Sequence, residues 1–233
     1  MRNAGFAGPA VSALIVLLVI FMNMENSAAM DRSAERIIDL PEPAHEGPVS
    51  LEQTLLKRRS ERYYSDAPLS LKEISQLLWA AQGITGGGEL RTAPSAGALY
   101  PLELFVAAGE VKGLDAGIYR YHPVDHTLER EISGDSRRDL WAAALRQSAV
   151  REAPAVFVFT AVFERTTQKY SSRGRQYVFM EAGHAAQNLC LQAEALDLGA
   201  VTIGAFDDSG VKNALGLNKD TRPLYLLPAG KTD

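Results

Sequence analysis

The sequence predicts an α+β domain in which helices cover a central sheet. Segments with helical periodicity and segments that read as strands are mixed along the chain, without the strict strand–helix alternation of parallel-sheet proteins. The 233 residues are 46% hydrophobic and 22% charged, a composition typical of a globular protein with one sizeable core. We therefore expect one main domain.

The first thirty residues differ in character from the rest of the chain. Arg2 precedes an apolar run from Ala10 to Met22, and the small residues Ser27, Ala28 and Ala29 follow it in the pattern that signal peptidase accepts. The run is about 13 residues long, against about 20 for a membrane span. We expect residues 1–29 to be a signal peptide cleaved near Ala29 or an uncleaved N-terminal anchor.

This segment sets the expected location and domain boundaries. The protein would be exported to the periplasm or anchored in a membrane, touching the membrane only through an uncleaved N-terminal segment; it would be cytoplasmic if the start is misassigned. Residues 30–48 carry three prolines and no helical period, which predicts an extended arm. Residues 49–233 form the predicted main domain.

Two capping boxes open the predicted helices of this domain. Ser50-Leu51-Glu52-Gln53 begins a helix with three leucines on one face, and Ser70-Leu71-Lys72-Glu73 begins a second helix that Gly83 ends. The leucines of the first helix are Leu51, Leu55 and Leu56. The inward residues of the second are Leu71, Ile74, Leu77, Leu78 and Ala81.

The remaining elements follow from periodicity and turn signals. Continuous apolar character over Ala155–Ala161 predicts a strand buried on both faces. Gly199 is expected to end the longest helix, Gln176–Leu196. Further strands are predicted at Glu103–Ala108, Gly117–His122, Thr127–Ile132, Val201–Phe206 and Leu224–Leu227, the second and third as a hairpin, and further helices at Asp135–Gln147 and Ser209–Leu215.

A basic cluster, KRRSERYY at residues 57–64, stands out in a chain of net charge −4. It could be a solvated helix end, a nucleic-acid patch or a socket for a compact anion. The negative net charge argues against nucleic acid, because phosphate backbones favour broad basic surfaces. Guanidinium forks and the Ser60 hydroxyl suit one phosphate group.

Two other patterns carry weaker chemical signals. The loop RTAPSAGALYP at residues 91–101 allows close backbone approach to a ligand, but it lacks both the phosphate-binding Walker pattern and a GxGxxG motif. Glu181, His184 and Asn188 lie on one helical face, but one copy of this pattern predicts a buried polar contact and no metal site. Cys190, the single cysteine, is expected in the core.

Taken together, these blocks resemble the FMN-dependent nitroreductase superfamily and its SagB-type branch, which includes thiazoline and oxazoline dehydrogenases. The resemblance covers residues 50 to 231 in order. The matching blocks are Arg58-Arg59-Ser60-Glu61-Arg62-Tyr63, Ala93 to Glu103, Lys169-Tyr170 with Arg173-Gly174-Arg175, Glu181 to Leu189, Val201 to Phe206 and Leu226 to Lys231.

The resemblance implies a nitroreductase-like fold with a mostly antiparallel central sheet, and an intertwined homodimer with FMN between the subunits. By matching positions, the basic cluster would hold the FMN phosphate and ribityl chain, and one loop of the partner subunit would face the ring and ribityl chain. The first set is Arg58, Arg59, Ser60 and Arg62, with Lys231 as a weaker phosphate ligand, and the second is Pro94, Ser95, Ala96 and Gly97.

Two further segments are implied by the same resemblance. Ile203, Gly204 and Ala205 would pass beside the flavin ring, where many relatives carry a glutamate and a glycine, so Gly204 departs from their pattern. Lys169 and Tyr170 match a pair implicated in proton removal in the azoline-oxidising members. The alternative is that they form a polar linker between a strand and a helix.

The function that follows is that of a flavoprotein oxidoreductase. FMN would carry hydride or two electrons, with NAD(P)H as co-substrate and a nitroaromatic, quinone or similar small molecule as acceptor. A SagB-type dehydrogenase of thiazoline or oxazoline rings on peptides is the alternative enzyme. A flavin-binding module without turnover is the alternative from another class.

Overall fold

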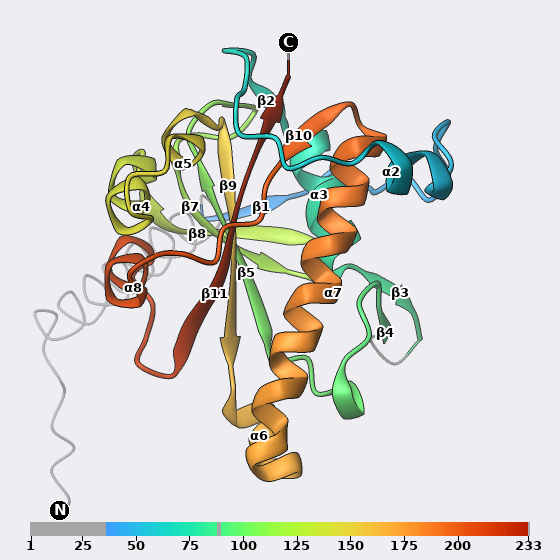
Figure 1. The fold of residues 1–233 in the computed structure, drawn as a ribbon, viewed down its shortest axis with the longest axis vertical. Helices are drawn as coiled ribbons and strands as arrows, with labels where there is room; N and C mark the ends of the chain where they lie inside the picture. The colour runs from blue at the N-terminus through green and yellow to red at the C-terminus, as the bar shows by residue number, and fades with distance from the viewer. Residues whose placement is uncertain (1–35, 88–89, 233) are drawn as a thin grey trace, which may run out of the picture. The chain divides into compact units, whose positions relative to one another are not determined.

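The computed structural model describes residues 36–87 and 90–232 (Figure 1). The predicted leader, residues 1–29, lies outside them. The central sheet is built from seven strands. They are β1 (Ile37–Asp39), β5 (Leu102–Ala108), β7 (Gly117–His122), β8 (Thr127–Ser133), β9 (Ala155–Val162), β10 (Leu198–Ala200) and β11 (Thr221–Lys231).

The sheet confirms the predicted α+β class. Its strand order is β1-β8-β7-β5-β9-β11-β10, and every pairing from β8 across to β10 is antiparallel. The helices are α2 (Leu51–Lys57), α3 (Leu71–Gln82), α4 (Arg137–Ala143), α5 (Ser148–Glu152), α6 (Glu164–Tyr170), α7 (Gly174–Ala195) and α8 (Asp208–Leu215), with 3-10 turns η1 (Ala96–Ala98) and η2 (Ser171–Arg173). Short ribbons pair β2 (Leu69–Ser70) with β6 (Val111–Lys112) and β3 (Ile84–Gly86) with β4 (Leu90–Arg91).

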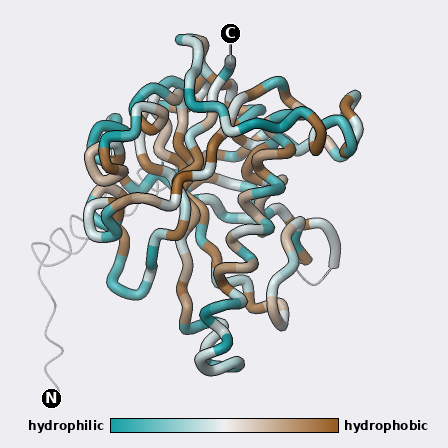
Figure 2. Tube along the Cα trace, in the orientation of Figure 1, coloured by the Kyte–Doolittle hydropathy of each residue, from teal (hydrophilic) through white to brown (hydrophobic). Residues whose placement is uncertain are grey.

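The central strand β9 is buried on both faces, as its continuous apolar sequence predicts. Phe157 and Phe159 pack into a core with α3 and α7, whereas Val156 and Val158 pack into a second core with α4, α5 and α8. Figure 2 shows hydrophobic residues along the central strands and hydrophilic ones on many surrounding loops. Alternation along one strand thus supplies both cores.

The second predicted helix, α3, forms as expected. Ser70 Oγ accepts a hydrogen bond from the Glu73 N–H at 3.2 Å, and the Glu73 carboxylate accepts one from the Ser70 N–H at 2.6 Å. This reciprocal capping box satisfies helix N–H groups that would otherwise lack partners. Gly83 follows the helix, and the inward residues Ile74 and Leu77 are fully buried.

The longest helix, α7, has 22 residues and is therefore about 33 Å long. The prediction that Gly199 ends it is wrong. The chain leaves the helix at Leu196 and turns at Asp197, whose φ is 58°, and Gly199 lies inside β10. A glycine is needed there because a Cβ would lie 2.7 Å from Glu61 Cβ.

Three other predicted elements need correction. The helix expected at Asp135–Gln147 ends at Ala143, because Leu145 and Arg146 adopt left-handed φ values of 53° and 59°. Residues 201–206 do not form a strand. They meet β11 through an isolated bridge between Ile203 and Leu226 and a bond from the Val201 N–H to Pro228 O at 3.3 Å. Lys169 and Tyr170 end a short helix, α6, instead of lying in a linker.

The first predicted helix, α2, forms at the expected place, with the Gln53 N–H donating to Ser50 Oγ. Its three leucines are exposed in the single chain, at 60% for Leu51, 56% for Leu55 and 69% for Leu56. Thr54 is the buried residue of this helix. The leucine face is thus open for contact with another molecule.

Part of the segment expected as an extended arm is described. Leu40 is buried in the core shared with α3 and α7, and Ala44 exchanges two backbone hydrogen bonds with the Gln76 side chain at 2.7 and 2.9 Å. Within residues 36–87 and 90–232, no helix has the length and apolar character needed to cross a membrane.

The reciprocal cap of α3 gives a stability prediction. We expect S70A to lower the free energy of unfolding by about 1 kcal/mol, because it removes one side of the capping box. S50A is the matched control and should cost less, because its cap lacks the reciprocal bond and α2 is largely exposed. Urea unfolding would measure both, and equal losses would contradict this account of the cap.

Candidate active site

The basic cluster lies on a loop that follows α2 and runs beside β10 and the end of β11. The Glu61 N–H donates to Ala200 O at 3.1 Å, and the Ser65 N–H donates to Lys231 O at 2.8 Å. The Tyr64 hydroxyl donates to Pro228 O at 3.1 Å. These bonds bring the loop and Lys231, distant in sequence, to one place.

The guanidinium groups of this loop are not paired with carboxylates in the described part of the chain. Within the described residues, Arg58, Arg59 and Arg62 form no ion pair with a carboxylate. Arg59 Nη1 donates only to nearby backbone carbonyls, and Arg62 Nη1 donates to Ser60 O at 3.1 Å. Such forks, with the exposed Ser60 hydroxyl, fit a phosphate monoester.

Lys231, predicted as a weaker phosphate ligand, already has a carboxylate nearby. Its Nζ atom lies 3.9 Å from Glu73 Oε1, so its charge already has a partner. The Glu73 carboxylate is in turn held by Ser70 at the start of α3. Lys231 could still contribute to the positive field around a bound phosphate, but the nearby Glu73 carboxylate partly offsets its charge.

The segment 203–205 lies further along β11. Ile203 is buried and exchanges two backbone hydrogen bonds with Leu226, whereas Gly204 and Ala205 are exposed. Leu226 is five residues from Lys231, a separation of about 16 Å along a strand. A ligand with a phosphate at one end and a planar ring at the other suits this spacing. The Tyr225 ring, which the sequence did not single out, lies beside Gly204: a Cβ at Gly204 would lie 3.5 Å from Tyr225 Cε1.

A second cluster unites the 94–97 loop with the Lys-Tyr pair. A Cβ at Gly97 would lie 2.7 Å from the Tyr170 hydroxyl and 3.0 Å from Lys169 Nζ, and Gly97 has a φ of 65°. Both chemical groups therefore lie directly over this glycine. Pro94 and Gly97 are exposed, and Ser95 and Ala96 are half-buried.

The loop is held in an unusual backbone conformation. Ala98 and Tyr100 have φ values of 51° and 43°, a region that costs non-glycine residues of order 1–2 kcal/mol each. Ser95 Oγ accepts from the Tyr100 N–H at 2.9 Å, and Arg165 Nη1 donates to Tyr100 O at 3.2 Å. Arg91 lies 4.4 Å from the centre of the Tyr100 ring.

Behind this loop lies Glu181, on α7. Burial raises the pKa of Glu181 to about 7, and a hydrogen bond from Ser95 and the charge of Arg91 act in the opposite direction. Asn188 Nδ2 donates to Thr92 O at 3.3 Å, while His184 is exposed. Asn188 thus makes the polar contact predicted for this helical face, and Glu181 is buried beside it. In the described part of the chain, no group of three or more His, Cys, Asp or Glu residues could hold a metal ion.

The two clusters lie at opposite ends of α7. Arg58 is close enough to Cys190 for its charge to lower the thiol pKa, which burial raises to about 11. Lys169 and Tyr170 come just before Gly174, where the helix begins. Sixteen helical residues separate Gly174 from Cys190, about 24 Å. Figure 1 accordingly shows α2 beside one end of α7 and α6 beside the other.

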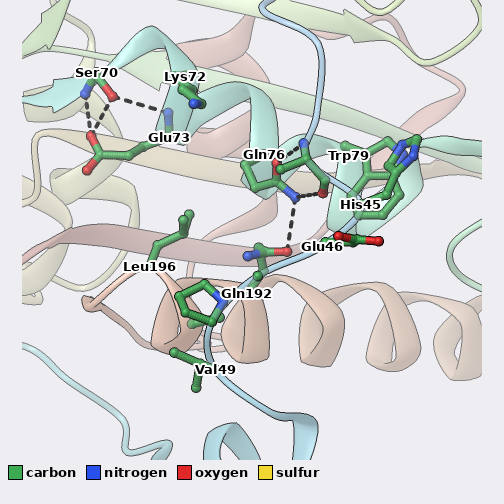
Figure 3. Close-up of a pocket in the computed structure, with 14 residues that line it drawn as sticks. His45, Glu46, Val49, Ser70, Lys72, Glu73, Gln76, Trp79, Gln192 and Leu196 are labelled. Atoms are coloured by element: carbon green, nitrogen blue, oxygen red, sulfur yellow. Dashed lines mark hydrogen bonds between the residues drawn. The ribbon is translucent and has the colours of Figure 1, made fainter.

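A separate cavity of about 530 Å³ lies between residues 44–49, α3 and α7. Figure 3 shows Gln76 at its wall, bonded to the arm and to Gln192. None of the residues predicted for the flavin site lines this cavity. This cavity therefore does not connect the basic cluster with the cluster at Gly97, Lys169 and Tyr170.

Comparison with known proteins identifies the fold family. The Nitroreductase family model matches residues 55–231. The chain belongs to the nitroreductase family. It is 43% identical over 183 residues to a provisionally named nitroreductase, MJ1384 of Methanocaldococcus jannaschii, covering 78% of this chain and 91% of that protein.

Two further proteins resemble this nitroreductase-family chain. A solved structure from Ralstonia eutropha JMP134, also provisionally named a nitroreductase, is 32% identical with a TM-score of 0.73, over 85% of this chain and 90% of the other. The microcin B17-processing protein McbC of Escherichia coli is 29% identical over 66% of this chain. The match covers only 58% of McbC.

The Gly97 contact gives a prediction for loop stability. We expect G97A to lower the free energy of unfolding by about 1–2 kcal/mol, because alanine is strained at a φ of 65° and its methyl group would displace Tyr170 or Lys169. The control is G47A, since no atom lies within 4 Å of a Cβ there. Thermal unfolding would compare them, and a harmless G97A would contradict the contact.

The buried carboxyl group predicts a pH dependence of stability. The pKa of Glu181 rises from 4.5 to about 7 on folding, so the native state binds more protons between these values. The free energy of unfolding should therefore fall as pH rises from about 4.5 to about 7 and then level off. The total loss should be at most about 3 kcal/mol.

Glutamine at this position removes the titration. We expect E181Q to lose this part of the pH slope in urea-unfolding series recorded from pH 4.5 to 8. Glu194, the other glutamate of α7, supplies the control, and E194Q should keep the slope of the unmodified protein. A slope that survives in E181Q would show that Glu181 does not titrate in this range.

Proposed function

We propose that this protein is an FMN-dependent oxidoreductase that transfers two electrons from NAD(P)H to a nitroaromatic, a quinone or a similar small acceptor. The observation that carries the proposal is the set of arginines at 58, 59 and 62, which have no carboxylate partner in the described chain and lie beside β11. Their chemistry fits the FMN phosphate, and the exposed 204–205 backbone further along β11 fits the ring.

We further propose that the working unit is a homodimer. The loop at 94–97 and the Lys-Tyr pair face solvent about 24 Å along α7 from the basic cluster, too far apart for one chain to place all of them around one flavin. A second copy related by two-fold symmetry could bring its own 94–97 loop to the first copy's arginines. The exposed leucine face of α2 supports such an association.

Bound FMN would supply the redox chemistry, taking a hydride from the donor and passing two electrons to the acceptor. The protein's share is binding and orientation. Arg58, Arg59, Ser60 and Arg62 would hold the phosphate, and the 204–205 backbone would border the ring. Lys169 or Tyr170 could move a proton at the substrate, because both reach the exposed surface of Gly97.

A second candidate is dehydrogenation of thiazoline or oxazoline rings on a modified peptide. The contact of Lys169 and Tyr170 with the 94–97 loop favours it, because a base is needed to take a proton as hydride leaves the ring. The likeness to McbC, a microcin-processing protein, points the same way. The peptide-handling parts would then come from partner proteins.

A third candidate is a flavin-binding module without turnover. We also propose a location for the protein. Residues 1–29 would direct its export or anchor it in a membrane. If the chain is exported unfolded, FMN would be acquired outside the cell. Fractionation of a C-terminally tagged protein, with its mass compared with a cut at Ala29, would test this. A cytoplasmic protein of full mass would contradict export.

The phosphate site can be tested by charge removal. We expect the R58A/R62A double variant to bind FMN at least about 100-fold more weakly, because two charge-assisted bonds are lost. The control is R138A/R151A, which removes the same charge from exposed positions on α4 and α5. Fluorescence titration of the apoprotein with FMN would measure both, and unchanged binding in the first variant would refute the site.

Turnover assays would separate the three candidates. The leading proposal predicts NADPH or NADH oxidation with menadione or nitrofurazone as acceptor, and K169M should retain part of it because Tyr170 can still move the proton. The second predicts oxidation of an azoline-containing peptide that K169M and Y170F both abolish. Bound FMN without reduction by either nicotinamide, and without azoline oxidation, would leave only the binding module.

A further inference from the structure

The central sheet splits between β5 and β7. Their antiparallel ladder ends at the pair of Phe105 and Arg120, although β5 stays paired with β9, and β7 with β8, beyond that point. A cavity of about 140 Å³ lies at this split, and residues of both strands beyond the last pair line it. Gln82, at the end of α3, and Arg165, on α6, form other parts of its wall. Side chains from four elements therefore meet where the two strands separate.

Gln82 brings an unsatisfied hydrogen-bond donor to this cavity. Its side chain is fully buried, and its Oε1 atom accepts a hydrogen bond from Arg91 Nη1 at 2.8 Å. Because an arginine can only donate, this bond fixes which end of the amide is the oxygen. The Nε2 group of Gln82 then has no hydrogen-bond partner within the described residues. Burying an N–H group without an acceptor is unfavourable, which favours an acceptor from outside the chain.

Arg120 contributes a second donor of this kind from β7. Arg120 Nη2 donates to Glu103 Oε2, and Arg165 Nη2 donates to Glu103 Oε1, so both oxygens of that carboxylate have a partner. The Nε atom of Arg120 is buried and has no partner in the described part of the chain. Two guanidinium charges and one carboxylate charge leave these three side chains with a net charge of +1.

A small monocarboxylate fits this combination of charge, donors and size. Its two oxygens can accept from the two N–H groups, and its single charge balances the net charge of the three side chains. A phosphate dianion would place a second negative charge beside Glu103. A nucleotide is too large, since pockets for drug-sized ligands have volumes of about 300–1,000 Å³.

We propose that the split between β5 and β7 is a binding site for a small carboxylate anion, which accepts hydrogen bonds from Gln82 Nε2 and Arg120 Nε. None of the residues predicted for the flavin site lines this cavity. The inference therefore goes beyond the proposed function and does not depend on bound flavin.

Acetate is the probe for this site. Broadening of the acetate methyl signal in NMR, recorded as the full-length protein is titrated, gives its dissociation constant. We expect saturable binding of acetate and a matching rise in the temperature of unfolding, because a ligand that binds only the native state stabilises it by mass action. Acetamide, which is neutral and of similar shape, and chloride at the same ionic strength should have neither effect.

Two variants test the two donors. Q82E keeps the size of the side chain and an oxygen that accepts from Arg91, but its second oxygen cannot donate and repels an anion. R120M removes the other donor together with its charge. We expect each variant to bind acetate at least ten-fold more weakly. The control, R138M, removes one positive charge from an exposed position on α4 and should stay within two-fold of the unmodified protein.

The outcomes decide whether the site exists and what its ligand is. Acetate that neither saturates nor stabilises would show that the cavity holds water alone, and this overturns the proposal. Unchanged affinity in both Q82E and R120M overturns it as well, and R120M carries the test if Q82E does not fold. Benzoate separates the sources of the carboxylate: weaker binding than acetate supports a small free acid, and tighter binding supports a carboxylate carried by a larger molecule at the same two donors.

Discussion

The burial of β9 on both faces is the constraint on which the rest of the structure depends. Phe157 and Phe159 need helices to cover one face of the sheet, and Val156 and Val158 need helices to cover the other. Leaving these apolar side chains exposed to water would destabilise the folded protein. α3 and α7 supply the first cover and α4, α5 and α8 the second. The antiparallel pairing of β9 with β5 and β11 then carries the chain to both ends of the sheet.

The length of α7 keeps the two clusters of candidate residues apart. Its C-terminal half passes the basic loop, and its N-terminal end follows the Lys-Tyr pair, so one helix both separates the two clusters and holds them at a set distance. Glu181 lies between these ends, on the buried side of the helix. The proposed two-chain flavin site would follow from this geometry, since two-fold symmetry can bring together groups that one chain keeps apart.

Local signals were sufficient where a residue acts on its immediate neighbours. The capping box at Ser70 and the apolar run of β9 were read directly, because both depend on contacts within a few residues or on total burial. The same signals failed where a distant partner decides. Gly199 resembles a helix terminator, but its missing side chain makes room for Glu61, a contact across more than a hundred residues of chain. Leu145 and Arg146 interrupt a helix that periodicity alone would have continued.

By itself, the sequence determined the α+β class, the order of most elements and, through several motifs in register, the nitroreductase resemblance and the candidate flavin residues. Residue types and their spacing along the chain are sufficient to indicate those features. Only the tertiary structure decided which candidates meet: Gly97 with Lys169 and Tyr170 at one end of α7, and the basic loop with Lys231 and β10 at the other. Such meetings depend on the angle and separation of packed elements, and no local pattern in a chain encodes them.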